Sequence, residues 1–421
     1  MSTVLEFPVE AGARTAPSTV RIGLLGLGHI GSALVHLARD ATTALQAAQI
    51  APAFTAALVR STRRPHPASD LVAHVTDDVE SFFAQPMDLV IEAMGGVEPA
   101  HTLVRRALLR RLPVITANKS LIAAHGESLS ALARQQQTAL RYEASCIAGV
   151  PFLGTFERRP LACRVDAVTA ILNGTSNAIL TRMEDGATFG DALEDAQRLG
   201  LAEPDPAMDV SGADGAEKLT ILLRLFARLI VAPRAISTRA IDALTPADLL
   251  AARGVGGVIK PIARASWRMD GLDAFVGPAL VGNRHPLGAV NGSTNGIVLH
   301  AAGGQQFYSG PGAGPDVTAA TLLDEVAELA VEGIVRSPSR IETRGTARIG
   351  VPAGRWLVRA SRPADATGLV DLLAVHDISC STVITVAGNA YGVTDVTPAD
   401  RVASADVLAL PVIEPLDERR C

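Results

Sequence analysis

Residues 20–31 read VRIGLLGLGHIG, and this stretch decides the fold of the first third of the chain. It opens with the apolar run 20–25, which is typical of a buried strand, and leads into the Ala- and Leu-rich segment 32–50, which predicts a helix. Between the two lies the motif GxGxxG, whose glycines permit a tight turn, a close approach of the backbone to a pyrophosphate, and close packing of helix on strand. Because the start of a helix also presents N–H groups and partial positive charge to phosphates, the stretch predicts a dinucleotide-binding fold.

The cofactor contacts expected from this motif are Gly26, Leu27, Gly28, His29, Ile30 and Gly31. The choice of cofactor depends on the end of the second predicted strand, residues 54–59, where a site for NAD usually has an acidic residue that binds the ribose 2′-hydroxyl. Here residues 60–64 read RSTRR, and the first acid is Asp70. Guanidinium groups bind a 2′-phosphate in a bidentate manner, so the segment favours NADP over NAD, with Arg60 as the expected contact. A solvated basic loop is the structural alternative.

The order of the predicted elements indicates an α/β class and divides the chain into domains. Apolar runs alternate with helical segments through residues 19–145, which predicts right-handed βαβ units and a parallel sheet, a dinucleotide-binding (Rossmann) domain. Residues 1–18 have no periodicity and predict a loose N-terminal tail. Residues 318–335 predict a helix that returns to the first domain, so this domain also includes about 310–350.

Residues 146–309 follow a different pattern. Strand-like runs at residues 165–172, 275–281 and 296–300 surround a helical block at residues 214–231. We therefore expect an α+β domain that binds the substrate and forms a dimer interface.

The last part of the chain, residues 355–421, predicts a strand, a helix, two strands, a short helical piece and a final strand. Gly388 and Asn389 lie between the paired strands, where both residue types tolerate the positive φ of a tight turn. This order predicts a small third domain.

Composition excludes several classes of function. Of the 421 residues, 48% are hydrophobic and 19% are charged, with a net charge of −5, so the chain has cores to bury and no overall basic character for nucleic acid. The four cysteines are far apart and suggest neither a disulfide framework nor a zinc site. No secretory leader is evident, and apolar runs such as residues 219–231 contain arginine and are too short to cross a membrane. We expect a cytoplasmic protein that acts on a small molecule.

A second motif combines acids with one lysine: residues 203–206 read EPDP, and Asp209, Asp214 and Lys218 follow. On a helix Asp214 and Lys218 lie on one face, where a solvated ion pair contributes a few tenths of a kcal/mol. Against this interpretation, Lys218 leads directly into the apolar run 219–223. Partial desolvation of the ammonium group would suit it to proton transfer. The spacing alone leaves both interpretations open.

Residues 200–206 (GLAEPDP), with Asp209, Gly212, Asp214 and Lys218, resemble the signature of the homoserine dehydrogenases. Three further segments resemble that family in the same order, namely TANK at 116–119, ILNGTSN at 171–177 and GPGAG at 310–314. The resemblance implies an oxidoreductase of threonine and methionine biosynthesis. It would transfer a hydride between NAD(P) and its substrates, aspartate 4-semialdehyde and homoserine.

The resemblance also implies roles for individual residues. Lys218 resembles the proton donor to the carbonyl oxygen, and Lys119 lies near both nicotinamide and substrate and polarises that oxygen. Glu203 and Asp214 resemble the carboxylates that bind the substrate ammonium group, and Asp214 joins the two lysines in the catalytic group. The other expected substrate contacts are Asp209, Asn173, Gly174 and Thr175. The other expected cofactor contacts are Gly95, Gly96, Ala117, Lys119, Gly200 and Gly314.

Residues 142–151, YEASCIAGVP, resemble the hinge of the same family. There a monovalent, sodium-like cation is held mostly by backbone oxygens at the positions of Glu143, Cys146, Ala148 and Val150. In this chain Ile147 and Ala148 replace glycines of the pattern, and isoleucine adopts a positive φ only at a cost. Cys146 itself has two interpretations. It is either a small apolar residue of the hinge or a nucleophilic thiol.

The tail from Trp356 resembles a shortened ACT domain, the ligand-sensing module of many homoserine dehydrogenases. A feedback ligand such as threonine and a purely structural or dimerising role both stay open, and the family resemblance implies a homodimer or larger homo-oligomer. Three other functions deserve comparison: an acylating aspartate-semialdehyde dehydrogenase, which needs a reactive cysteine with a histidine partner; a catalytically silent regulator that binds NADPH and an amino acid; and a dehydrogenase for a related hydroxy-amino acid.

Overall fold

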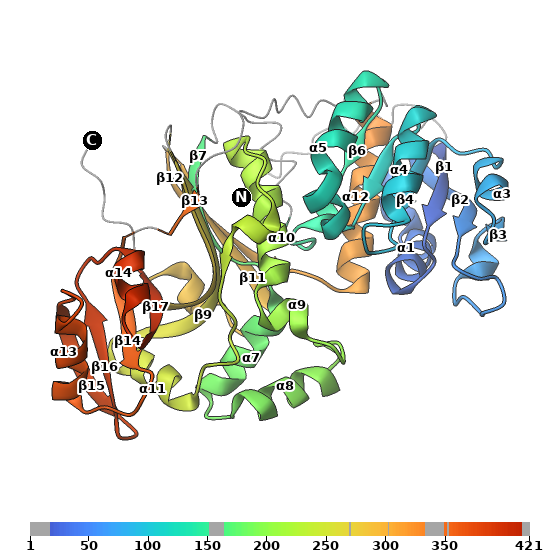
Figure 1. Ribbon diagram of the computed structural model, residues 1–421. Helices are drawn as coiled ribbons and strands as arrows, with labels where there is room; N and C mark the ends of the chain where they lie inside the picture. The colour runs from blue at the N-terminus through green and yellow to red at the C-terminus, as the bar shows by residue number, and fades with distance from the viewer. Residues whose placement is uncertain are drawn as a thin grey trace, which may run out of the picture.

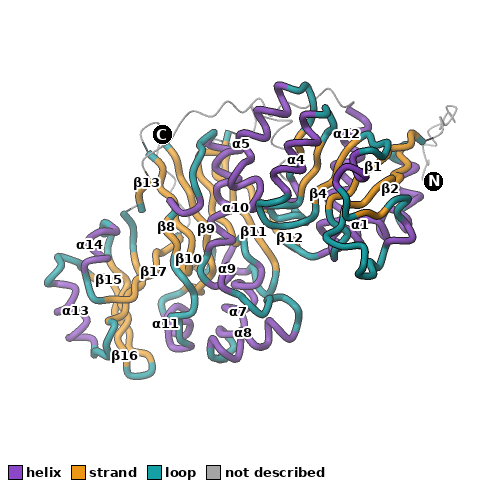
Figure 2. The backbone as a smooth tube through the Cα atoms, turned by 45° about the vertical axis from the view of Figure 1, so that its right-hand side comes forward, coloured by secondary structure: helices purple, strands orange, loops and turns teal. Residues whose placement is uncertain are grey.

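A computed structural model describes residues 17–150, 164–268, 271–301, 303–332, 349–351 and 353–414. Two sheets organise these residues, a six-stranded sheet near the N-terminus and an eleven-stranded sheet that includes the C-terminal part (Figure 1). Helices α5 and α10 run side by side between the two sheets (Figure 2). In the described residues no helix has both the length and the apolar character needed to cross a bilayer.

The six-stranded sheet is wholly parallel, with the strand order β3-β2-β1-β4-β5-β6. This doubly wound order confirms the predicted Rossmann fold, whose ligands bind beyond the carboxyl ends of the strands. Its strands are β1 (Ser18–Leu25), β2 (Ile50–Leu58), β3 (Val75–Thr76), β4 (Leu89–Glu92), β5 (Val114–Thr116) and β6 (Leu140–Arg141). Its helical elements are α1 (His29–Asp40), α2 (Thr42–Ala47), η1 (Ser69–Leu71), α3 (Val79–Phe83), α4 (Ala100–Leu109), α5 (Lys119–Gln135) and η2 (Glu143–Ser145).

Two predicted boundaries in this part were wrong. The segment 32–50 forms two helices rather than one, because the backbone leaves the helical region at Ala41 and the Thr42 hydroxyl binds the Arg39 carbonyl oxygen. The second strand begins at Ile50, not at Phe54, directly after the left-handed residue Gln49. An alanine-rich segment contains no breaker that would reveal the interruption.

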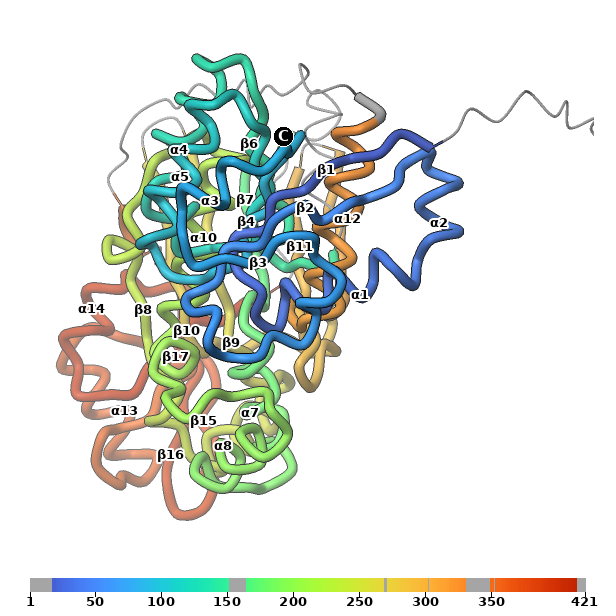
Figure 3. Tube along the Cα trace, turned by 90° about the vertical axis from the view of Figure 1, so that its right-hand side faces the viewer, coloured from blue at the N-terminus to red at the C-terminus, as the bar shows by residue number. Residues whose placement is uncertain are grey.

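Helix α12 (Pro315–Glu332) returns to the six-stranded sheet, as predicted, and lies beside α1 (Figure 3). Its buried residues Leu322 and Val326 belong to the same apolar core as Ile22 and Leu34. The returning helix therefore covers the face of the sheet near the glycine motif. The predicted residues beyond Glu332 lie outside the described part of the chain until Ile349.

The eleven-stranded sheet follows the path β12-β11-β7-β9-β10-β17-β14-β16-β15, and two short strands, β8 (Ser237–Thr238) and β13 (Ile349–Gly350), pair with β10. Its long strands outside the C-terminal part are β7 (Val165–Ile171), β9 (Gly257–Trp267), β10 (Leu272–Gly282), β11 (Thr294–Ala301) and β12 (Gly304–Pro311). The helical elements of this part are α7 (Gly174–Glu184), α8 (Phe189–Arg198), α9 (Ala207–Val210), α10 (Ala213–Leu222), η3 (Leu223–Ala227), η4 (Pro233–Ala235), α11 (Pro246–Gly254) and η5 (Pro286–Ala289). The predicted helical block 214–231 was too long, because the π-helical turn η3 ends at the left-handed residue Arg228.

The C-terminal part has the predicted order of elements. These are β14 (Trp356–Ala360), α13 (Ala366–Ala374), β15 (Cys380–Val386), β16 (Asn389–Thr394), α14 (Ala399–Ser404) and β17 (Val407–Ile413). The tight turn is formed by Ala387 (φ 49°) and Gly388 (φ 80°), not by Gly388 and Asn389. Parallel pairing of Leu280 with Val412 joins β17 to β10, so the tail continues the large sheet instead of forming a separate one.

Candidate active site

The glycine motif has the geometry of a phosphate cradle. Gly26 turns the chain with φ +99° and donates its N–H to the Leu58 carbonyl oxygen at 3.0 Å. A Cβ on Gly31 would lie 2.2 Å from the Gly26 carbonyl oxygen, so only glycine allows this packing. A Cβ on Gly28 would enter open space at the start of α1, where no side chain caps the helix and no acid lies in the first turn. The free N–H groups there fit a dinucleotide pyrophosphate.

Buried Glu92, at the carboxyl end of β4, organises the neighbouring loops. Its carboxylate accepts hydrogen bonds from the Thr116 hydroxyl at 2.5 Å, the Met94 amide at 2.8 Å and the Asn118 side chain at 3.3 Å. Burial raises the pKa of Glu92, and these hydrogen bonds offset part of the rise. Glu92 was not predicted from the sequence. The signal that could have identified it is an acidic residue directly after the apolar residues of a buried strand.

Asn118 connects the same loops to helix α5. Its side-chain oxygen caps the helix by accepting from the Leu121 amide at 3.0 Å, and its Nδ2 donates to the Gly96 carbonyl oxygen at 2.6 Å. Four of the predicted cofactor contacts thus lie close together at one edge of the sheet, with Gly95, Gly96 and Ala117 on connected loops and Lys119 where the next helix starts. Lys119 is the first residue of α5.

The centre of the candidate site is the carboxylate of Asp214, in the first turn of α10. Asp214 is only 1% exposed. Lys218, one helical turn later, forms an ion pair with it at 3.0 Å, and Lys119 forms a second ion pair from helix α5. The Lys218 ammonium also donates to the Leu172 carbonyl oxygen at 2.7 Å. Two lysines that are 99 positions apart in sequence therefore converge on one carboxylate, Lys119 from α5 and Lys218 from α10.

Charges in this cluster stabilise one another. Burial by itself would raise the pKa of Asp214, but the ammonium groups of Lys218 and Lys119 hold it well below its usual range. Burial lowers the pKa of Lys119, and the nearby Asp214, Glu217 and Asp209 more than offset that effect, so its pKa lies above the usual value. At neutral pH Asp214 is therefore an anion and Lys119 a cation.

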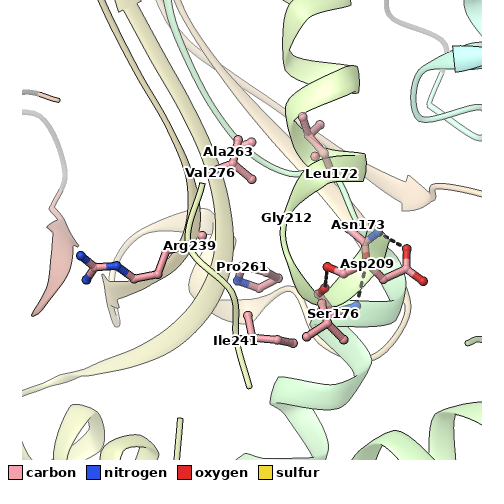
Figure 4. A pocket seen from close by; sticks show the side chains of 13 residues that line it. Leu172, Asn173, Ser176, Asp209, Gly212, Arg239, Ile241, Pro261, Ala263 and Val276 are labelled. Carbon is pink, nitrogen blue, oxygen red and sulfur yellow. Dashed lines mark hydrogen bonds between the residues drawn. The ribbon is translucent and has the colours of Figure 1, made fainter. Parts of the chain in front are cut away.

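The predicted substrate contacts at the start of α7 adjoin this cluster through Asn173, which Figure 4 shows beside Asp209. Asn173 donates to Asp214 at 2.8 Å and to Asp209 at 2.7 Å, and it caps α7 by accepting from the Ser176 amide at 2.7 Å. Gly174 and Thr175 thus form the first turn of a capped helix, whose amides suit a carboxylate.

A small, partly open pocket lies next to Asn173 and Asp209. Pro261, Ala263 and Val276 form an apolar part of its wall, and Figure 4 shows these strand residues opposite the polar pair. Lys119 and Lys218 are not among the described residues that line it, so the pocket borders the reactive cluster without containing it.

Glu203 lies apart from this cluster. Its side chain is exposed, and within the described ranges no hydrogen bond or ion pair joins it to Asp214 or to the lysines. Its carbonyl oxygen accepts from the Gln197 side chain at 3.2 Å. The same exposed loop holds Gly200, which has φ 71°.

The basic segment predicted to select the cofactor is also exposed. Arg60 follows β2 by two residues, close to Leu58, whose carbonyl oxygen binds the glycine motif. The only acid that contacts this segment among the described residues is Asp77, whose carboxylate accepts from the Thr62 amide and hydroxyl at 3.1 Å each. Arg60 therefore lies on the cofactor edge of the sheet.

The hinge segment joins the loop before α12. Ala148 donates its amide to the Gly312 carbonyl oxygen at 3.2 Å, and the Thr321 hydroxyl donates to the Ala148 carbonyl oxygen at 2.5 Å. Gly314, another predicted cofactor contact, closes that loop with φ +132°. Buried Ile147 adopts φ 54°, so a turn that favours glycine forms in this chain despite the cost to a branched residue.

Cys146 in this hinge is not suited to nucleophilic catalysis. Its thiol is fully buried, and burial raises its pKa to about 12. Because the thiolate is the reactive form, this environment opposes an acylating aspartate-semialdehyde dehydrogenase. Of the other predicted cation ligands, Glu143 and Val150 flank the same turn, and the residues after Val150 up to Cys163 lie outside the described part.

Four residues where α5 meets α10 and the following turn η3 were absent from the sequence-based prediction. The Ser120 hydroxyl donates to the Glu217 carboxylate at 2.9 Å, and the Arg224 guanidinium donates to the Ile122 carbonyl oxygen at 2.7 Å. They lie close to Lys119 or Lys218 in sequence, but only the folded chain reveals that they meet.

Comparisons with known proteins agree with this geometry. The family model described as "Homoserine dehydrogenase, NAD binding domain" matches residues 26–143, and the one described as "Homoserine dehydrogenase" matches residues 151–327. A homoserine dehydrogenase from Synechocystis sp. is 34% identical over 329 residues, which are 76% of this chain and 75% of that protein. One from Mycobacterium tuberculosis is 33% identical over 372 residues, 85% of this chain and 83% of its own length.

Solved structures give the same result. The homoserine dehydrogenase from Thiobacillus denitrificans superposes with a TM-score of 0.82 at 29% identity, covering 94% of this chain and 99% of its own. The S. aureus enzyme at pH 7.0 has a TM-score of 0.78 at 28% identity, with 95% and 100% covered. The matched families span both the glycine motif and the two-lysine cluster. This chain therefore belongs to the homoserine dehydrogenase family.

Proposed function

We propose that this chain interconverts aspartate 4-semialdehyde and L-homoserine with NADP as the preferred cofactor. The observation that carries the proposal is the convergence of Lys119 and Lys218 on the buried carboxylate of Asp214. The silent regulator is the weaker candidate, because two ammonium groups held around one carboxylate exceed what amino-acid binding requires.

Each lysine has a distinct task. When hydride reaches the aldehyde carbon, negative charge develops on the carbonyl oxygen, and a nearby ammonium group must neutralise it. Lys218, with a side chain only 10% exposed, is the proposed proton donor to that oxygen, and Lys119 stabilises the charge from the cofactor side. The chemistry that a bound nicotinamide supplies is hydride transfer to or from the substrate carbon. Asp214 keeps both ammonium groups in place.

The amino-acid part of the substrate requires groups of both signs. We assign the α-carboxylate to the amides of Gly174 and Thr175 at the start of α7, because a helix N-terminus attracts anions. We assign the ammonium group to Glu203, Asp209 and Asp214. Of these carboxylates Asp214 is already bound by two lysines, so the contact falls mainly to Asp209, which shares Asn173 with Asp214, while Glu203 contributes from the exposed loop outside the cluster.

The preference for NADP rests on the segment after β2. Arg60 is exposed at the cofactor edge, and the sequence from Val59 to Ser69 contains no acid that would bind a ribose 2′-hydroxyl. The other proposed cofactor contacts are Gly26, Leu27, Gly28, His29, Ile30, Gly31, Gly95, Gly96, Ala117, Lys119, Gly200 and Gly314.

Three further features belong to the proposal. The left-handed backbone at Ile147 supports a sodium-like site formed by Glu143, Cys146, Ala148 and Val150, mostly through backbone oxygens.

The β-α-β-β-α-β order of residues 355–414 supports an ACT-like domain, and a homodimer agrees with the family. We divide the chain into the Rossmann domain with α12, the substrate domain and this tail.

The deciding experiment measures initial rates with homoserine and with aspartate 4-semialdehyde, each with NADP(H) and with NAD(H). Turnover of both substrates with a preference for NADP(H) is expected. Cofactor binding without turnover of either substrate would show instead that the chain is a catalytically silent regulator. Turnover only with a different hydroxy-amino acid would move the chain to a specialised pathway.

A further inference from the structure

We infer that Arg224 is a positioning residue that holds helix α5, and with it Lys119, against helix α10. The inference rests on the proposed function in one respect, because it takes Lys119 and Lys218 as the pair that handles charge on the substrate oxygen. Lys119 starts α5, whereas Asp214 and Lys218 lie on α10. The relative position of these two helices therefore sets the geometry of the whole cluster.

The contact is specific and buried. Arg224 is 5% exposed, and its Nη1 donates to the Ile122 carbonyl oxygen at 2.7 Å, in the first turn of α5. Ile122 is three residues after Lys119, so the guanidinium binds the same helical turn that begins with the catalytic lysine. The hydrogen bond from Ser120 to Glu217 at 2.9 Å supports the same turn of α5 from α10 itself.

The local backbone is adapted to deliver Arg224. It is the second residue of the π-helical turn η3, which begins directly after the last residue of α10. Such wide turns are rare and occur frequently at functional sites. They cost stability that a regular helix would not lose. The turn therefore indicates a role that an ordinary continuation of α10 would not fulfil.

The burial of Arg224 also indicates that this residue positions helix α5 rather than stabilises the fold. Burial lowers the pKa of this guanidinium, and its Nε has no hydrogen-bond partner among the described residues. An incompletely paired buried cation destabilises a fold compared with an apolar side chain of the same size. The directed hydrogen bond to Ile122 gives this buried cation a role in fixing helix α5, and Tyr142 and Glu127 lie near enough to offset part of the lowering of its pKa.

Helix α5 has a matching recess at Gly126. A Cβ at this position would lie 2.1 Å from Arg224 Nη1 and 3.1 Å from its Cζ. Glycine in a helix interior costs about 1 kcal/mol relative to alanine, so the recess is unfavourable for the helix itself. Gly126 therefore accommodates the guanidinium at the expense of helix stability.

This recess provides a sharp test. Gly126→Ala favours the helix but displaces the guanidinium, and Arg224→Met removes the hydrogen bond while keeping most of the volume. Arg224→Lys retains a donor that reaches toward Ile122. Gly190→Ala in α8 is the matched control, because a Cβ there meets only the Thr188 hydroxyl, at 3.8 Å.

We expect Gly126→Ala and Arg224→Met to lower kcat for homoserine roughly 10- to 100-fold, the effect of misplacing a reacting group by about 1 Å. NADPH affinity and the melting temperature of Gly126→Ala should stay close to wild type. As Lys119 moves from Asp214 its raised pKa falls, so the alkaline limb of the kcat profile moves to lower pH. Arg224→Lys should recover most of the rate, and Gly190→Ala should match wild type.

Two results would overturn the inference. One is a folded Gly126→Ala variant with wild-type kcat and an unchanged alkaline limb. The other is a loss of rate that follows the fraction of unfolded protein without any movement of that limb, which indicates a purely structural arginine. If Arg224→Met does not fold, the Gly126→Ala and Arg224→Lys variants still test the inference. Failure of the proposed function is distinguishable, because the wild-type chain would then not turn over homoserine at all.

Discussion

Replacing Asp214 by asparagine is the most informative single change at the active site. The substitution keeps the size of the side chain and removes only its charge. Lys119 and Lys218 then lose the carboxylate on which they converge, while Asn173 still has an oxygen to bind at about the same place. The change therefore isolates the electrostatic organisation of the cluster.

The size of the effect follows from the exposure of the three groups. Removing one partner from a fully buried ion pair costs about 3–5 kcal/mol. Asp214 and Lys218 are nearly buried, but the Lys119 side chain is 36% exposed and its ion pair is weakened by solvent. Each charged hydrogen bond contributes about 1.5–3 kcal/mol, so we expect transition-state stabilisation to fall by about 3 kcal/mol, which is about a 150-fold loss in kcat/KM for homoserine.

The pH dependence of Asp214→Asn gives a second, independent measure. Asp214 contributes to the raised pKa of Lys119, so in wild type this lysine stays protonated to a higher pH than usual. Without the carboxylate the pKa falls, and the protonated form is lost earlier as pH increases. The alkaline limb of the rate profile should move to lower pH, which steady-state rates between pH 7 and about 11 would measure.

Asp195→Asn provides the matched control. Asp195 also pairs with two cations, Arg182 at 3.0 Å and Arg198 at 2.8 Å, but it lies on the exposed surface of α8. Its removal should leave all kinetic constants near wild type. If Asp214→Asn retained more than about a third of wild-type kcat/KM with an unmoved alkaline limb, the carboxylate would not organise the lysines.

The remaining predictions concern single groups of the same site. Lys218→Ala should lower kcat by about 10²–10⁴-fold while NADPH titration gives a normal affinity, and a variant with more than about a tenth of the wild-type rate would contradict the proton-donor assignment. Replacing Arg60 and Arg63 together with alanine should weaken NADPH more than NADH in fluorescence titrations, since only NADPH carries the 2′-phosphate; equal losses would show that these arginines do not bind it. Glu203→Gln should raise the KM for homoserine about 10- to 150-fold with kcat and cofactor affinity nearly unchanged, and a wild-type KM would make Glu203 a surface residue, as its exposed side chain in this structure allows.

Much of the Rossmann part could be predicted from local sequence. An apolar strand, three glycines and a helix form a continuous segment, and the physical reasons for each residue act within a few positions. The prediction failed where the signal was compositional only, at the break between α1 and α2 near Ala41. Alanine favours a helix but does not specify where the helix ends.

The hinge illustrates a different limit. Ile147 at a position of positive φ contradicts the local preference of a branched residue. Packing of the surrounding chain, in which Ile147 is buried, outweighs a cost of about 1–3 kcal/mol. Sequence reasoning correctly identified the strain, and only the folded structure shows that the surroundings compensate for it.

The sequence by itself determined the glycine cradle, the pairing of Asp214 with Lys218 one helical turn apart, and the family resemblance, because each depends on residues close together in the chain or on a motif. Tertiary structure alone decided that Lys119 forms an ion pair with the same carboxylate, that Glu203 lies outside the cluster, and that Arg224 meets helix α5 beside Gly126. These contacts join residues that are tens of positions apart. Their geometry follows from how α5 and α10 pack between the two sheets, and no local pattern encodes that arrangement.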